Sequence, residues 1–329
     1  MIDGVRARSL AAIAVSLAFS CVLSCAGAPA PKPFAASLPS FAPGARLVVV
    51  GDLQRTSLLE LWRESNDEER PVIVAAIAEA QPSLVAITGD CVFDGSSDAK
   101  WADFDALVAP LRDAGVPAVI AFGNHEYWGS RARAEAHVFA RFPYLASRHW
   151  YAFAWGPLRV VVLDSNEREL SANERHAQNA WYARTLSELD ADDAARGVVV
   201  MLHHPPYTNS TVTGDEAHVQ RDFVPAFVRA RKTLAMMTGH VHSYERFVRD
   251  GKTFVVSGGG GGPRARLLTG DDRRHLDDAF PGPALRDFNF VVLSASDVGL
   301  VAEVRGLPKG AKDTTSVYAM DRFALPFAR

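Results

Sequence analysis

From Arg46 onward, short apolar runs rich in β-branched residues alternate with longer stretches that have helical spacing of their apolar positions. The strand-like runs are residues 47–50, 84–88, 118–122, 160–163, 198–202 and 234–237, and the helix-like stretches are 71–80, 101–114, 131–141, 173–189 and 216–230. After His242 only strand patterns follow, at 245–249, 253–257, 289–293 and 300–304. This alternation predicts an α/β layered fold with one or two central sheets in a single domain.

The first residues have the pattern of an export signal. Arg6 and Arg8 precede an uncharged apolar run over 10–23, which is shorter than the roughly 20 residues of a membrane-spanning helix. We therefore expect residues 1–25 to be a secretory signal peptide, with an uncleaved signal anchor as the alternative. The tetrapeptide that ends at Cys25 resembles a bacterial lipobox. It predicts a lipoprotein of the cell envelope, periplasmic or on the outer membrane, and without lipidation a secreted protein.

Five prolines between residues 28 and 44 predict an extended tether over 26–44, so that 45–329 forms the folded domain. Cys91 is the only cysteine outside the predicted signal, so no internal disulfide is expected after processing. Lys plus Arg (35) nearly balance Asp plus Glu (38). This composition is typical of a soluble surface and argues against nucleic acid as a partner.

Five apolar runs end in side chains that can bind metals. These are Gly51-Asp52-Leu53-Gln54, Gly89-Asp90, Gly123-Asn124-His125-Glu126, His203-His204 and Gly239-His240-Val241-His242. In α/β sheets the functional crevice lies beyond the carboxyl ends of the strands. A single Gly-Asp pair is more often a turn, but the ordered set of five predicts a metal site at one rim.

This ordered set is similar to the signature of calcineurin-like metallophosphoesterases. Three further passages, at 150–165, 178–181 and 239–246, resemble the purple acid phosphatase branch, and the similarity covers about residues 46–262. The resemblance implies a four-layer αββα sandwich of two mixed sheets flanked by helices. It also implies a hydrolase that cleaves phosphate esters by attack of a hydroxide bridging two metal ions.

Carried over residue by residue, the resemblance implies that Asp90 bridges two divalent ions. Asp52 and His242 would complete one site, and Asn124, His203 and His240 the other. Carboxylate, amide and imidazole ligands suit Mn, Zn or Fe without selecting among them.

His125 is expected to act as a general acid or phosphate contact, with Glu126 orienting it. Asn124, His125 and His218 are the expected substrate-binding residues, although a solvated helix residue is an almost equally good account of His218. His204 is expected to belong to a structural loop, and Trp150 and Trp181 to the core.

Two positions depart from the family pattern. Phe93 replaces the Tyr whose phenolate binds Fe(III) in purple acid phosphatases, which argues for two divalent ions and against a coloured protein. Gln54 replaces a His ligand of other members and offers an amide oxygen that can coordinate weakly or through water.

The leading functional hypothesis is hydrolysis of small-molecule phosphate monoesters at the cell envelope. A phosphodiesterase acting on nucleotides or lipid headgroups is the alternative within the same chemistry. A catalytically inactive metal-binding lipoprotein is the alternative from another class. The glycine run 258–262 lacks the ending of a P-loop and predicts close backbone packing near the metal rim.

Overall fold

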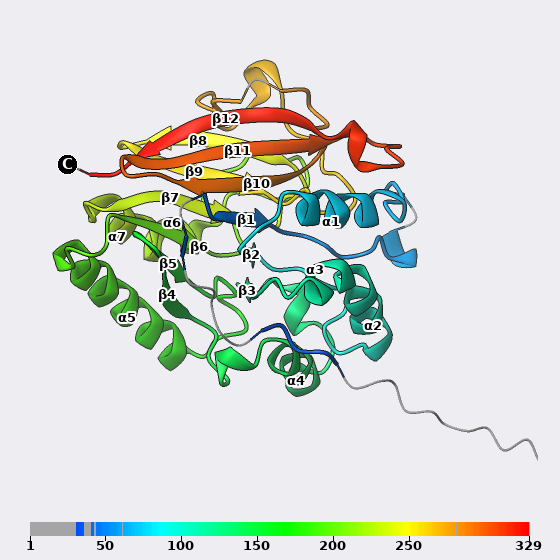
Figure 1. Ribbon diagram of the computed structural model, residues 1–329, viewed down its shortest axis with the longest axis horizontal. Coiled ribbons are helices and arrows are strands. Elements are labelled where there is room, and N and C mark those ends of the chain that lie inside the picture. The colour runs from blue at the N-terminus through cyan, green and yellow to red at the C-terminus, as the bar shows by residue number, and fades with distance from the viewer. Residues whose placement is uncertain (1–30, 36–40, 43, 61, 281, 329) are drawn as a thin grey trace, which may run out of the picture. The chain divides into compact units, whose positions relative to one another are not determined.

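The computed structural model describes residues 31–35, 41–42, 44–60, 62–280 and 282–328. The predicted signal peptide and Cys25 lie outside the described residues. Residues 31–329 form one compact unit, in which two six-stranded sheets lie between helices (Figure 1).

Sheet A combines three parallel strands from the first part of the chain with three antiparallel strands from its end. Its order is β12 (Tyr318–Pro326), β11 (Gly299–Leu307), β10 (Phe288–Ala295), β1 (Arg46–Val50), β2 (Leu84–Ile87) and β3 (Ala118–Ile120). The pairs β1–β2 and β2–β3 are parallel, and β10 joins β1 in antiparallel register.

Sheet B is mixed in the same way. Its order is β4 (Tyr151–Trp155), β5 (Leu158–Val162), β6 (Gly197–Met201), β7 (Thr233–Thr238), β9 (Lys252–Ser257) and β8 (Tyr244–Arg249). The inner strands β5, β6, β7 and β9 are parallel, and the two edge strands β4 and β8 are antiparallel.

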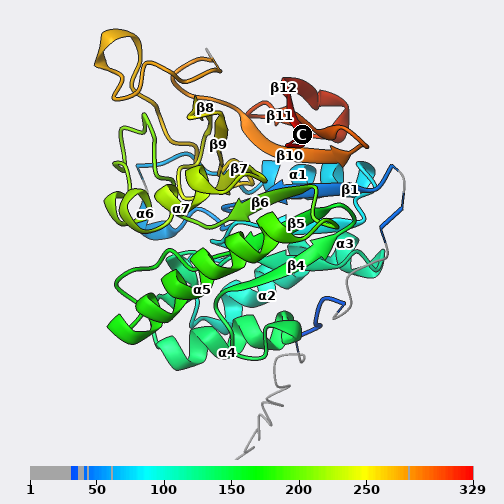
Figure 2. The same cartoon turned by 90° about the vertical axis from the view of Figure 1, so that its left-hand side faces the viewer.

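The helices lie on the outer sides of the two sheets. They are α1 (Glu69–Glu79), α2 (Asp98–Leu107), α3 (Ala109–Asp113), α4 (Arg131–Arg141), α5 (Ala172–Ala191), α6 (Ala217–Asp222) and α7 (Val224–Arg229). Figure 1 shows α1, α2 and α3 on the side away from α5, and Figure 2 shows α5 in front of the strands β4 to β6.

Alternation along the strands of sheet B separates two hydrophobic cores. Val160 and Val162 belong to the core that includes sheet A, whereas Val161 belongs to a second core with Tyr182 of α5 and Phe227 of α7. Strands buried on both faces need continuous apolar runs, and this is the pattern of residues 160–163. The four-layer αββα prediction is therefore confirmed.

Two expected helices are interrupted in the structure. Residues 101–114 divide into α2 and α3, and residues 216–230 divide into α6 and α7. Pro110 and Pro225 lie at the starts of the second helices. A proline has no N–H to donate and clashes with the preceding turn, so it ends one helix and suits the first turn of the next.

The strands β4 and β12 were not among the expected strands. In β4, buried Tyr151 and Trp155 enclose only three residues, so the alternation is too short to stand out. In β12 only Leu325 is buried, because this strand lies at the edge of sheet A.

Part of the predicted tether packs against the domain. Phe34 is buried, its ring stacks on Phe142 at 5.3 Å, and its N–H donates to the carbonyl of Arg141. The guanidinium of Arg112 lies over the same ring. The proline content predicts an extended tether, but it does not show that Phe34 packs this part of the segment onto the domain.

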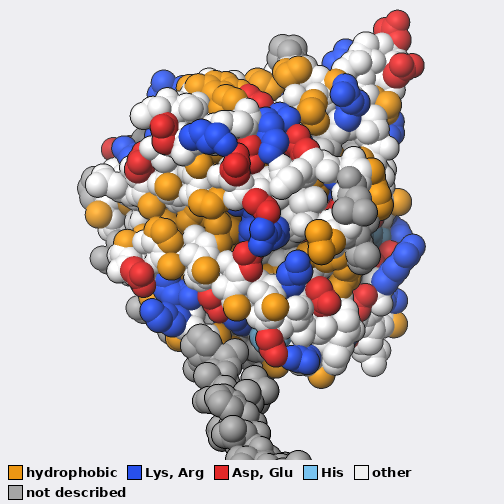
Figure 3. Space-filling view, turned by 90° about the vertical axis from the view of Figure 1, so that its right-hand side faces the viewer, with side chains coloured by type: hydrophobic (Ala, Val, Ile, Leu, Met, Phe, Trp, Pro, Cys, Tyr) orange, Lys and Arg blue, Asp and Glu red, His pale blue; other side chains and the backbone are white. Residues whose placement is uncertain are grey.

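Acidic and basic side chains are interspersed on the face seen in Figure 3, in keeping with the nearly balanced composition. Within the described residues, no helix is both long and apolar enough to cross a membrane.

Candidate metal centre

The predicted metal-binding residues all follow the carboxyl ends of parallel strands. Asp52, Asp90 and Asn124 follow β1, β2 and β3 of sheet A, and His203 and His240 follow β6 and β7 of sheet B. Since the two sheets face each other with these ends on the same side, residues up to 190 positions apart in sequence meet.

One cluster of ligand atoms forms around His203, and we call it site 2. Its Nε2 lies 3.1 Å from Asn124 Oδ1, 3.1 Å from His240 Nδ1 and 3.2 Å from Asp90 Oδ2. Asn124 Oδ1 is also 3.1 Å from His240 Nδ1. Ligand atoms bonded to one ion at about 2.1 Å are separated by roughly 3 Å, so these side chains fit a transition metal.

The second cluster, site 1, consists of Asp52, Asp90 and His242, whose ligand atoms lie within 4.8 Å of one another. His242 Nε2 is 3.3 Å from Asp52 Oδ1 and 3.1 Å from Gln54 Nε2. Among the described residues, the buried acceptors Asp52 Oδ1 and Gln54 Oε1 have no hydrogen-bond donor. Two buried acceptors without donors, on residues that both contact His242, fit a bound cation.

The outer nitrogens of two imidazoles are held by backbone carbonyls. His203 Nδ1 donates to the carbonyl of Thr88 at 2.8 Å, and His242 Nδ1 donates to that of Pro263 at 2.9 Å. A carbonyl only accepts, so each Nδ1 carries the proton and each Nε2 is left to coordinate.

The charges of the centre are strongly coupled. Burial opposes ionisation of Asp90, but the neighbouring imidazoles of His203 and His125 outweigh it and hold the pKa of this carboxyl well below its usual range. Burial likewise opposes protonation of His203, yet the carboxylate of Asp90 raises its pKa to about 10. Burial and the charge of His203 lower the pKa of His240 to about 3. The metal-free centre therefore stores one proton on His203.

His125 lies at the edge of both sites. Its Nδ1 donates to the carbonyl of Phe93 at 2.6 Å, and its Nε2 lies 3.8 Å from Asp90 Oδ2. The side chain thus presents Nε2 to the space between the ligands, where a general acid would be needed.

Glu126 does not orient His125, contrary to our expectation. Its buried carboxylate accepts the backbone N–H groups of Asp90 at 2.8 Å, Cys91 at 2.7 Å and Gly123 at 2.8 Å. Burial and the charge of Asp90 raise the pKa of Glu126 to about 7. Glu126 joins the loops after β2 and β3, and so fixes two ligands relative to each other.

Three ligands have a left-handed backbone. Asp52, Asp90 and His240 have φ of 61°, 56° and 66°, which is uncommon for residues other than glycine. Glycines on neighbouring ligand loops leave room for the two carboxylates, because a Cβ on Gly123 would lie 2.2 Å from Asp90 Oδ1 and one on Gly239 would lie 2.5 Å from Asp52 Oδ2.

The glycine run at 258–262 packs against site 1. A Cβ on Gly262 would lie 2.6 Å from the ring of His242, and one on Gly258 would lie 2.7 Å from Asp52 Oδ2. The prediction of close backbone packing near the metal rim is confirmed.

His218 and His204 lie beside site 2 in different roles. His218 Nε2 donates to the carbonyl of Ser165 at 2.7 Å, and its Nδ1 lies 3.3 Å from Glu216. His204 is held by Ser165 Oγ at 2.9 Å, and burial lowers its pKa well below the usual range. His218 lines a 420 Å³ cavity together with Asn124 and His240.

The metal centre lies between two cavities. The larger is this 420 Å³ cavity on the site 2 side, and the smaller has 120 Å³ and is lined by Arg63, Phe93 and His242. Sequence reasoning missed Arg63, which donates to the Pro263 carbonyl at 2.5 Å and pairs with Glu60 at 2.9 Å. An isolated arginine in a loop carries no sequence signal of such a role.

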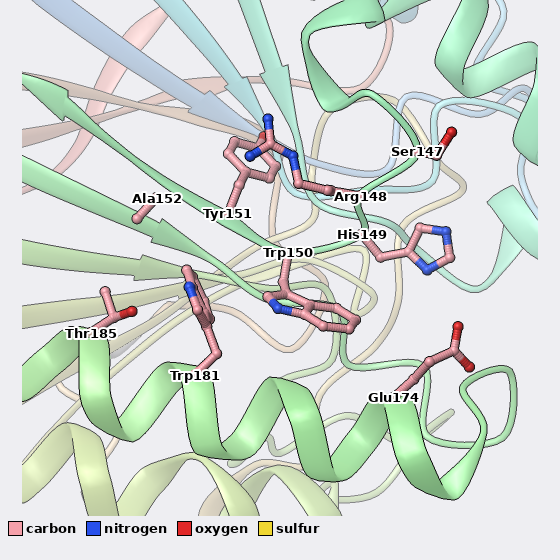
Figure 4. A pocket seen from close by; sticks show the side chains of 9 residues that line it. All are labelled: Ser147, Arg148, His149, Trp150, Tyr151, Ala152, Glu174, Trp181 and Thr185. Atoms are coloured by element: carbon pink, nitrogen blue, oxygen red, sulfur yellow. The ribbon is translucent and has the colours of Figure 1, made fainter.

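Another cavity, of 540 Å³, lies away from the ligands. It is lined by Trp150, Trp181 and Glu174, among others (Figure 4). Both tryptophans are half-buried. Trp181 packs against the hydrophobic core between sheet B and the helices α5 and α7, as expected, whereas Trp150 belongs to none of the buried clusters of the described residues. None of the residues of the metal centre lines this cavity.

The model of a family described as calcineurin-like phosphoesterases matches residues 45–244. A probable cyclic nucleotide phosphodiesterase of a Synechococcus species is 22% identical over 169 residues, which are 50% of this chain and 60% of that protein. Purple acid phosphatase 18 of Arabidopsis thaliana is 24% identical over 258 residues, which are 74% of this chain and 54% of that protein. The chain thus spans little more than half the length of these relatives.

Among solved structures, a purple acid phosphatase from yellow lupin (Lupinus luteus) seeds has a similar fold. The TM-score is 0.67 at 19% sequence identity, and the similarity covers 90% of this chain and 55% of that one.

Proposed function

The chain belongs to the calcineurin-like phosphoesterase family, and from this we propose that it hydrolyses phosphate monoesters at a centre of two divalent metal ions. The observation that carries the proposal is the position of Asp90. Its carboxylate belongs to the site 1 cluster and also lies 3.2 Å from His203 Nε2 of site 2. One carboxylate shared by two ligand sets is what a dinuclear site requires.

Two bound ions, Mn, Zn or Fe, would supply a nucleophile at neutral pH and neutralise the charge of the phosphoryl group. Asp52, His242 and Gln54 would hold one ion, and Asn124, His203 and His240 the other.

The remaining chemistry falls to His125. Its Nε2 is directed between the two sites and would donate a proton to the leaving alcohol oxygen. Asn124 and His125 would also contact the phosphoryl oxygens, and His218 would contact the substrate from the larger cavity.

A phosphodiesterase is the second candidate. Cavities of 120 and 420 Å³ lie on the two sides of the centre, so the second substituent of a diester, such as a nucleotide or a lipid headgroup, has room. The similarity to a probable cyclic nucleotide phosphodiesterase points the same way.

We further propose that the protein is exported and held at the cell envelope by lipid on Cys25. Labelled palmitate should be incorporated into the full-length chain and not into Cys25→Ser. Labelling that persists in Cys25→Ser would refute this anchor.

Metal analysis and turnover on p-nitrophenyl phosphate and bis-p-nitrophenyl phosphate, after reconstitution with Mn, Zn or Fe, test the function. Two ions per chain and faster monoester cleavage are expected, and Asp90→Asn should lose both metal and turnover. Faster diester cleavage would favour the second candidate. Two bound ions with neither activity would favour an inactive metal-binding lipoprotein, and absence of metal binding would refute the proposal.

A further inference from the structure

The 420 Å³ cavity has the size and position of a site for the leaving group. One end is formed by Asn124 and His240 of site 2, and it extends over the turn after β5 and the start of α6. Cavities of about 300–1,000 Å³ are typical of small-ligand sites. The cavity on the other side of the centre has only 120 Å³, so a bulky alcohol has room on the site 2 side.

Trp128 provides an aromatic surface in this cavity. Its ring lies 3.8 Å from that of His125 and 5.2 Å from that of Phe93, measured between centroids, so it is held in place. It is nevertheless 41% exposed. An exposed indole that is fixed by its neighbours and opens into a cavity offers a flat apolar face to a ring.

The rest of the lining is polar and includes three carboxylates, those of Glu167, Glu169 and Glu216, and the guanidinium of Arg168. Glu167 pairs with Arg221 at 2.9 Å, and Glu216 lies 3.3 Å from His218. Among the described residues, no ion pair is formed by Glu169 or by its exposed neighbour Arg168, both of which line the cavity. Carboxylates in excess of cations do not favour a further anionic group on the alcohol, but they can accept hydrogen bonds from its hydroxyl groups.

We infer that the substrate is the phosphate ester of a ring-bearing alcohol with several hydroxyl groups, a sugar phosphate or a nucleoside monophosphate. The ring packs on Trp128, and its hydroxyls donate to Glu169 and Glu216. Water attacks phosphorus, the bond from phosphorus to the ester oxygen breaks, and that oxygen takes up a proton, so the products are the free alcohol and inorganic phosphate. The inference rests on the proposed phosphatase activity and specifies its substrate class.

The kinetic test compares kcat/KM for glucose 6-phosphate, adenosine 5′-monophosphate and glycerol 3-phosphate with the metal-loaded full-length protein. All three are esters of primary alcohols, so their leaving groups need similar protonation. At least one ring substrate should exceed glycerol 3-phosphate by about tenfold or more, the size of one aromatic stacking contact. Trp128→Ala should reduce this ratio to near one, and Trp128→Phe should retain most of it.

The ratio of kcat/KM values distinguishes loss of ring binding from damage to the catalytic centre. Any disturbance of His125 by Trp128→Ala slows all three substrates, whereas loss of ring binding slows only the ring esters. Trp150→Ala is the matched control, because Trp150 lines the separate 540 Å³ cavity and its loss should leave the ratio unchanged. Whichever ring ester has the higher kcat/KM relative to glycerol 3-phosphate shows whether the preferred alcohol is a sugar or a nucleoside.

Calorimetric binding of free glucose and free adenosine provides a readout without turnover. One of them should bind to wild type and Trp150→Ala and not to Trp128→Ala. Binding of free glucose or adenosine without phosphatase activity would refute the proposed function but support the binding site for a ring at Trp128. Phosphatase activity with equal kcat/KM for all three esters, and no binding of either free alcohol, would overturn the inference.

Discussion

Metal binding to the metal-free protein should release the proton stored on His203. The carboxylate of Asp90 raises the pKa of this imidazole to about 10, and Nε2, which faces the ligands, must be unprotonated to coordinate. At pH 7 removal of that proton costs three pH units at about 1.4 kcal/mol each, or roughly 4 kcal/mol. The apparent affinity at pH 7 is then about a thousandfold below its limiting value at pH 10.

Metal affinity should rise with pH because the proton and the metal ion compete for the same nitrogen of His203. Below pH 10 the protonated form dominates, so apparent metal affinity should rise about tenfold for each pH unit between 6.5 and 8.5. Because burial and the charge of His203 lower the pKa of His240 to about 3, that ligand is already neutral and adds no further proton.

The assay is calorimetric titration of Mn²⁺ into chelator-treated protein at pH 6.5, 7.5 and 8.5, in buffers of different ionisation enthalpy. The buffer dependence of the heat counts the protons released, and His203 should contribute one of them in addition to any released by metal-bound water. His176→Asn, a change at an exposed histidine of α5, should keep the same slope. An affinity that is independent of pH, with no proton released, would refute the coupling of Asp90 and His203.

Three further predictions concern single side chains. His125→Ala should keep two metal ions per chain by elemental analysis and lower kcat by about 10²- to 10⁴-fold; wild-type turnover would exclude the acid role. Burial raises the pKa of Glu245 to about 7, so its contribution to stability is complete below its ordinary pKa of 4.5 and is lost as pH rises through 7. The free energy of unfolding, measured with urea, should fall between pH 5 and pH 8, and Glu245→Gln should reduce this fall by up to about 3 kcal/mol. An equal fall in both proteins would contradict the raised pKa of Glu245. Phe34→Ala should lower the free energy of unfolding by about 3 kcal/mol, measured with urea, and a change below about 0.5 kcal/mol would mean that the packed segment adds no stability.

Sequence patterns located most of the fold because most strands are buried on both faces. Such strands are continuous apolar runs, as at 160–163 and 198–202, and are easily recognised. The missed strand β12 is an edge strand with one buried residue, Leu325, so its burial leaves almost no pattern. The docking of Phe34 depends on Phe142 and Arg112, which belong to other elements, and local composition cannot reveal such a contact.

The candidate ligands could be predicted because they follow strand ends in a fixed order. Residues that position the ligands through contacts with the backbone could not be predicted from the sequence. Sequence adjacency pairs Glu126 with His125, whereas its carboxylate accepts one N–H group from its own loop and two from the loop after β2. Trp128 and Arg63 gain their position from distant loops, since Arg63 reaches the carbonyl of Pro263 200 residues away.

The left-handed backbone of Asp52, Asp90 and His240 has a consequence for how the centre is assembled. Each such residue costs about 1–2 kcal/mol, and the packing of the surrounding fold must offset that strain. Because the ligand atoms of site 1 already lie within 4.8 Å of one another and the other ligand atoms of site 2 lie 3.1 or 3.2 Å from His203 Nε2, binding of the proposed ions would require little rearrangement of the chain. Substitutions that relax the backbone at these positions should therefore raise the free energy of unfolding and remove metal ligands, so stability and metal binding oppose each other there.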